Sequence, residues 1–165
     1  MADTEQLFAR AEAAWRGGDG AAAQDLSIQV LAADPGHAGA LMILINLRFA
    51  VGDIAGARPY LQCLADLMPD EVMIRNNLGR AMLADAAPEQ AAVEFQAVVA
   101  REPQNARALD GLGIARHRLG DYEGAADLHR RATAADPGFA AAWCNLGIAC
   151  TDLGLYAAGA AALDK

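Results

Sequence analysis

The sequence predicts an all-α protein made of five consecutive helical hairpins. Four prolines recur every 34 residues, at Pro35, Pro69, Pro103 and Pro137. Small residues recur at the same interval and in phase with the prolines, at Ala23, Ala57, Ala91, Ala125 and Gly159. The composition is 55% hydrophobic but only 5% aromatic, and a chain rich in Ala and Leu favours closely packed helices over sheets.

The common register divides the chain into repeats. They span residues 4–37, 38–71, 72–105 and 106–139, and a shorter fifth repeat spans 140–165. Apolar residues at repeat positions 4, 7, 11, 20, 24 and 27 lie at helical spacing in two runs. A fixed period of this length indicates hairpins that stack on their neighbours. We therefore expect a single array over 1–165, with about ten antiparallel helices and a core that includes Leu78, Ala91, Phe95, Leu112, Ala125 and Leu146.

The turn residues justify the helix ends. In three repeats a glycine suited to a helix C-cap precedes an aspartate suited to an N-cap: Gly18 and Asp19, Gly52 and Asp53, Gly120 and Asp121. In the third repeat Pro88 suits the first helical position. The four regularly spaced prolines should end each second helix, because proline disfavours helical geometry in the preceding residue. Pro59 lies inside the expected second helix of repeat two and should kink or delay it.

The repeat pattern resembles the tetratricopeptide repeat family, W-x2-L-G-x2-Y, then A-x3-F, then A and P. The fifth repeat matches through Trp143, Leu146, Gly147, Gly154 and Tyr156. The fourth matches through Leu109, Leu112, Gly113, Tyr122, Ala125, Ala132 and Pro137, and the third through Leu78, Gly79, Ala91, Phe95 and Pro103. The resemblance implies a right-handed superhelical solenoid in which the first helix of every hairpin lines a concave, peptide-binding groove.

Charge and residue types argue against several other functions. A net charge of −8 makes nucleic acid an improbable partner, because phosphate binding needs clustered cations. The acidic start MADTEQLFAR is unlike a signal peptide, and no apolar run is long enough to cross a membrane. Twelve arginines against one lysine are typical of a GC-rich bacterial genome.

Catalytic and metal chemistry have no pattern to support them. The cysteines at 63, 144 and 150 form neither a zinc motif nor a disulfide framework, which favours a cytoplasmic location. Ser27 is the only serine and lacks a nucleophile motif. His129 is interpreted as a packed aromatic residue. We therefore expect a protein that is not an enzyme and has no catalytic residues, metal or cofactor.

By the resemblance, repeat positions 2, 5, 6, 9, 12 and 13 face the groove. The first two repeats contribute an apolar set that we do not expect a hairpin to need for its own core: Phe8, Trp15, Met42, Ile43 and Phe49. The third and fourth repeats contribute a polar and basic set, Asn76, Asn77, Arg80, Arg107, His117 and Arg118, partly offset by Asp110. Asn145, Thr151 and Asp152 end the wall.

This composition predicts a peptide groove. Amides would hold a main chain, arginines would bind an acidic side chain or a C-terminal carboxylate, and aromatics would take an apolar anchor. Asn77 and Asn145 stand where similar repeat proteins, including the O-linked sugar transferases, present an asparagine ladder.

Three functions remain open. The leading hypothesis is a non-catalytic scaffold that binds a protein segment. An alternative is the amino-terminal regulatory array of a larger enzyme, resembling repeat-bearing glycosyltransferases, sulfotransferases or aspartyl hydroxylases. A third is a pilus-assembly or envelope lipoprotein, weakened because the first cysteine is Cys63. The fifth repeat stops near position 26 with no polar capping helix, so its side around Trp143, Leu146 and Leu163 should be covered by self-association or by a following domain.

Overall fold

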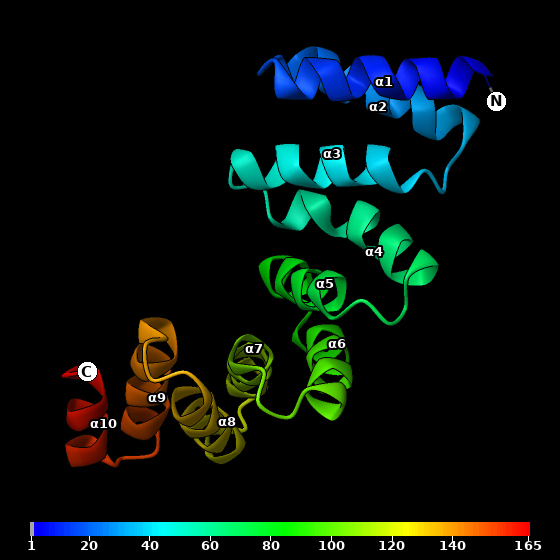
Figure 1. Cartoon of the computed structure of the whole chain (residues 1–165). Coiled ribbons are helices and arrows are strands. Elements are labelled where there is room, and N and C mark those ends of the chain that lie inside the picture. The colour runs from blue at the N-terminus through cyan, green and yellow to red at the C-terminus, as the bar shows by residue number, and fades with distance from the viewer. Residues whose placement is uncertain (1) are drawn as a thin grey trace. The chain divides into compact units, whose positions relative to one another are not determined.

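The structure, a computed structural model, describes residues 2–165 and contains within them ten α-helices, one short 3-10 helix and no strand (Figure 1). Successive helices pair into five hairpins, as the repeat register predicts. The elements are α1 Ala2–Arg16, α2 Gly20–Ala33, α3 Ala38–Ala50, η1 Ala55–Ala57, α4 Arg58–Leu67, α5 Val72–Ala84, α6 Pro88–Arg101, α7 Ala106–Arg118, α8 Tyr122–Ala135, α9 Ala140–Asp152 and α10 Tyr156–Leu163.

The helix ends lie where the turn residues predict them. All four regularly spaced prolines follow the end of a second helix, and no described helix crosses one. The Asp19 and Asp121 carboxylates accept hydrogen bonds from the backbone N–H groups of Ala22 at 3.0 Å and Gly124 at 2.9 Å. These contacts satisfy donors that would otherwise be unpaired in the first turn of each second helix.

Two turns depart from this form. In repeat two, residues 55–57 form a 3-10 turn and α4 begins only at Arg58. The second helix is therefore delayed, as Pro59 predicts. In the third turn Ala86 adopts a positive φ of 53°, where the equivalent residues are glycines with φ of 75° to 83°. A left-handed alanine costs about 1 kcal/mol or more relative to a helical one. Pro88 takes the first helical position, as predicted.

The chain divides into two compact units, Met1–Ile74 and Arg75–Lys165. Unit 1 holds the first two hairpins, and unit 2 holds nearly all of the remaining three. The division lies near the start of α5, in the third repeat. Each unit is described separately below.

The core of unit 2 depends on glycines that let two helices approach closely. The Phe95 ring of α6 lies between Gly79 of α5 and Gly111 of α7, where an added Cβ would be 2.8 Å and 2.5 Å from ring atoms. One repeat later the His129 ring packs in the same way on Gly113, at 2.6 Å. The predicted core residues Leu78, Ala91, Phe95, Leu112, Ala125 and Leu146 are all buried.

Gly111→Ala should destabilise the protein. The new methyl group would overlap the Phe95 ring, and the ring cannot move away because Gly79 closes its other side. Overpacking of this kind costs about 1–3 kcal/mol, of which about 1 kcal/mol is returned by the better helix propensity of alanine. Urea unfolding measures the difference.

The matched control is Gly138→Ala. Gly138 lies in a turn, and the nearest atom to its added Cβ is a carboxylate oxygen 3.4 Å away, so its effect should stay within about 0.5 kcal/mol. Equal stability of the two variants would refute the close-packing argument.

Candidate functional site

The first helices of unit 2 carry a row of polar side chains, which we call the first-helix wall: Asn76, Asn77, Arg80, Arg107, Asp110, His117, Arg118, Asn145, Thr151 and Asp152. Three contacts join these helices. Arg118 of α7 donates a hydrogen bond to the Leu83 carbonyl of α5. Between α7 and α9, Asn145 Nδ2 donates to Asp110 Oδ1 at 3.0 Å, and His117 Nε2 lies 2.6 Å from Asp152 Oδ2. Each contact joins residues 35 apart on successive first helices.

A buried polar network links the wall to α8. Asp110 and His129 are only 5% and 1% exposed, and His129 Nδ1 lies 2.8 Å from Asp110 Oδ1. Because a carboxylate oxygen accepts hydrogen bonds, the two groups form a hydrogen bond in the tautomer that carries the proton on Nδ1. Asn145 supplies the second donor to the same carboxylate. The network satisfies a buried acidic group that would be costly to leave without partners.

Sequence interpretation found only half of this arrangement. His129 is a packed aromatic residue, as expected, but it is also the hydrogen-bond partner of Asp110. The missed signal is a spacing of 19 residues between a first and a second helix. Arg75 and Glu94 have the same spacing and form a 2.7 Å ion pair. Complementary residues 19 apart therefore indicate contacts within a hairpin.

The two asparagines of the expected ladder are engaged through opposite ends. Asn145 uses its NH₂ group toward Asp110, whereas the Asn77 carbonyl oxygen accepts a hydrogen bond from Arg80 Nη1 at 3.3 Å. The Asn76 carbonyl oxygen is buried without a hydrogen-bond partner among the described residues. The two ladder asparagines therefore differ in which amide atom is already hydrogen-bonded: the nitrogen in Asn145 and the oxygen in Asn77.

The basic side chains of the wall also differ in how far they are engaged. Arg80 and Arg107 are exposed on α5 and α7. The Arg118 guanidinium is bound to a backbone carbonyl, and Thr151 donates to the Gly147 carbonyl of its own helix at 2.8 Å. Of these three arginines, Arg118 is thus the one that is bound to a neighbouring first helix.

The apolar residues expected to line the groove lie in unit 1, and three of them serve its core. Ile43 is buried, and Phe8 and Trp15 pack half-buried against the cluster that it forms with Ala11 and Ala23. The expectation that the hairpins do not need these side chains for their own packing is therefore wrong for these three. Met42 is exposed and Phe49 is half-buried.

His37 has a structural role at the start of α3. His37 Nδ1 accepts a hydrogen bond from the Ala40 N–H at 3.3 Å and caps α3. No cluster of three or more metal-ligating side chains occurs in residues 2–165. Across the same residues, no helix combines the length and hydrophobicity that a membrane span requires.

Comparison with known proteins identifies the repeat family. The family model described as tetratricopeptide repeat matches residues 8–71, 76–138 and 118–165. The chain belongs to the tetratricopeptide repeat family. Members of this family are typically non-catalytic protein-interaction scaffolds, and membership confirms the resemblance drawn from the repeat pattern. No curated protein matches the sequence.

Solved structures share the tetratricopeptide fold. The crystal structure of MamA protein is 22% identical, with a TM-score of 0.85 over 99% of this chain and 90% of that one. MamA 41-end from Desulfovibrio magneticus RS-1 is 19% identical, with a TM-score of 0.82 over 98% of this chain and 91% of that one. These matches confirm the predicted all-α solenoid class.

His129→Phe should destabilise this tetratricopeptide array. Phenylalanine stands at the equivalent position of the preceding repeat, where Phe95 fills the same kind of glycine slot, so the ring should still fit. The change removes one of the donors to buried Asp110 and should cost about 1–3 kcal/mol in urea unfolding.

The rescue is Asp110→Asn combined with His129→Phe, because repeat three carries this pair as Asn76 and Phe95. The double variant should recover much of the lost stability, since it removes the buried charge. If it is no more stable than His129→Phe alone, the Asp110 carboxylate is not what the histidine stabilises.

Proposed function

We propose that the chain is a non-catalytic scaffold that binds an extended segment of a partner protein along the first-helix wall of unit 2. The observation that carries the proposal is the set of three polar contacts between successive first helices. They hold α5, α7 and α9 together through side chains of the wall itself. A surface organised before binding loses less conformational freedom when a ligand docks.

The chemistry of the wall favours a partner with carboxylates. Arg80 and Arg107 are exposed cations on neighbouring first helices, and Asn77 is hydrogen-bonded to Arg80. Asp110, an acid of the same wall, is buried and already bound by His129 and Asn145. An acidic side chain or a C-terminal carboxylate could therefore form charge-assisted hydrogen bonds here.

Asparagine geometry supports a main-chain contact at the far end of the wall. The network of Asp110 and His129 fixes the amide of Asn145, so the side chain would not need to be ordered by the ligand. As a separate proposal for unit 1 alone, Met42, Phe49 and the exposed part of Trp15 take an apolar side chain of a partner protein. A cytoplasmic location belongs to the scaffold proposal and is supported by free thiols at Cys63, Cys144 and Cys150.

Arg80→Ala and Arg107→Ala should each weaken binding of a peptide by about tenfold or more, because a charge-assisted hydrogen bond is worth about 1.5–3 kcal/mol. The ligands would be peptides selected by the full chain from a library with free carboxyl ends. Titration at two salt concentrations measures the loss, and the affinity should fall as salt rises.

The control is Arg130→Ala. Arg130 is an exposed arginine of α8 that pairs with Asp127 away from the wall, so this variant should bind normally. Thermal unfolding should be little changed in all three variants. Normal binding by folded Arg80→Ala and Arg107→Ala variants would show that the partner uses another surface.

We further propose that copies of the chain associate through the exposed side of the last hairpin. Leu155, Tyr156 and Leu163 are all exposed, with Tyr156 at 70%, and adjacent apolar side chains of this kind favour association. Leu146, expected in this surface, is instead buried at 7% exposure. The surface therefore consists of residues around α10 and the turn before it.

Replacing Leu155 and Tyr156 together by Ser should shift the protein toward monomer in sedimentation velocity at high concentration, since it removes apolar area from the contact. Val93→Ser, an equally exposed apolar residue on α6, should leave the distribution unchanged. A monomeric parent protein at all concentrations would contradict the proposal.

A further inference from the structure

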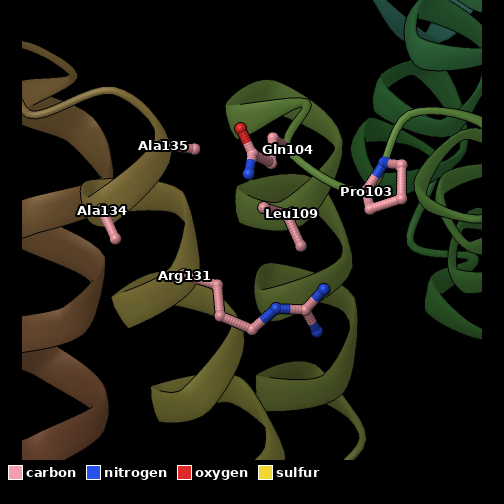
Figure 2. A pocket seen from close by; sticks show the side chains of 6 residues that line it. All are labelled: Pro103, Gln104, Leu109, Arg131, Ala134 and Ala135. Atoms are coloured by element: carbon pink, nitrogen blue, oxygen red, sulfur yellow. The ribbon is translucent and has the colours of Figure 1, made fainter.

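Hairpin four contains a pocket that the first-helix wall does not use. It has a volume of about 410 Å³ and is lined by Pro103, Gln104, Leu109, Arg131, Ala134 and Ala135 (Figure 2). Two lining residues come from the turn between α6 and α7, one from α7 and three from the last turns of α8. A pocket of this size can take a small ligand or a large side chain.

In hairpin five the corresponding first-helix position carries a tryptophan that contacts the preceding turn. Trp143 stands one repeat after Leu109, and its Nε1–H donates a hydrogen bond to the Pro137 carbonyl at 3.0 Å. Pro137 stands one repeat after Pro103. In hairpin four, the Leu109 side chain is smaller than an indole ring and carries no N–H group that could donate to the Pro103 carbonyl.

Hairpins two and three also differ from hairpin four at this position. In hairpin two, where Leu41 corresponds to Leu109, the Leu67 side chain lies over the turn, with its Cδ2 3.6 Å from an added Cβ at Gly36. In hairpin three the position of Leu109 holds Arg75, which is bound to Glu94 at 2.7 Å. Leu67 corresponds to Ala135, so hairpin four lacks both the tryptophan and the leucine.

We propose that this pocket binds the side chain of a tryptophan carried by a partner protein. The indole N–H would donate to the Pro103 carbonyl, as Trp143 does to Pro137 in the next hairpin. Ala134 and Ala135 provide exposed apolar contacts, and Leu109 lines the pocket from a buried position. Arg131 extends from α8 toward α7 (Figure 2), where its guanidinium can pack against the face of an aromatic ring.

The chemistry of the pocket favours an indole over other ligands. Three of its six lining residues are Ala or Leu, and Arg131 is its only charged member, so a carboxylate would leave most of the lining unused. A phenyl ring would fill the apolar part but could not donate to the Pro103 carbonyl. The inference does not rest on the proposed peptide wall.

The probe is N-acetyltryptophanamide, titrated into the full ¹⁵N-labelled chain. We expect saturable shifts of the backbone amides of Gln104, Leu109, Arg131 and Ala134, with a dissociation constant of about millimolar order for so small a ligand. Methylation of the indole nitrogen should weaken binding about fivefold, because it removes one hydrogen bond. No saturable shift of these residues, or equal binding by the methylated probe or by acetate, would overturn the proposal.

Two variants close the pocket with residues that the chain uses in other hairpins. Leu109→Trp copies hairpin five, and Ala135→Leu copies hairpin two. Both should abolish the shifts. Ala135 is exposed, so its variant should fold even if the larger change at buried Leu109 is not tolerated.

Ala100→Leu is the control, because Ala100 is an exposed alanine of α6 outside the pocket lining. It should bind the probe like the parent chain. Undiminished shifts in the folded Ala135→Leu variant would place the probe elsewhere and refute the assignment.

Discussion

The close approach of helices over glycine is the constraint on which unit 2 depends. Phe95 fits because Gly79 and Gly111 leave room on its two sides, and His129 fits on Gly113. These contacts set how near successive helices can lie, and packed interiors leave little freedom to adjust. Short polar contacts between first helices, such as the one from Asn145 to Asp110, are possible only at that separation. The polar wall is thus a consequence of apolar packing behind it.

His129 shows how one replacement can change a repeat from a packing unit into a polar junction. Its ring occupies the place that Phe95 has one repeat earlier, but its nitrogen holds a buried carboxylate, and that carboxylate holds Asn145 on the next hairpin. A second helix therefore influences a side chain of the wall without lying in it. Because every member is hydrogen-bonded, the network can specify the orientation of Asn145.

Sequence reasoning predicted the hairpins, their ends and the buried core because these follow from the 34-residue period and from local rules for proline, glycine and aspartate. It did not predict the hydrogen bond of His129, because a position interpreted as apolar can still direct one atom toward an acid. It placed Phe8 and Trp15 in the groove, although both side chains pack half-buried against the core of unit 1. The pocket of hairpin four escaped it for another reason: an unfilled volume depends on several small side chains at once, and no single residue indicates it.

The contacts between first helices connect residues 35 apart, whereas the sequence repeats every 34. Each bonded pair therefore straddles a repeat boundary and joins one position to the next position of the following repeat. A recombination event that exchanged whole repeats would preserve the contacts of Phe95 with Gly79 and of His129 with Gly113, which lie within one hairpin, but it would separate these pairs. The unit that must be inherited together to keep these contacts is thus a pair of neighbouring first helices. A substitution at one bonded residue restricts which residues are compatible at its partner in the adjoining repeat.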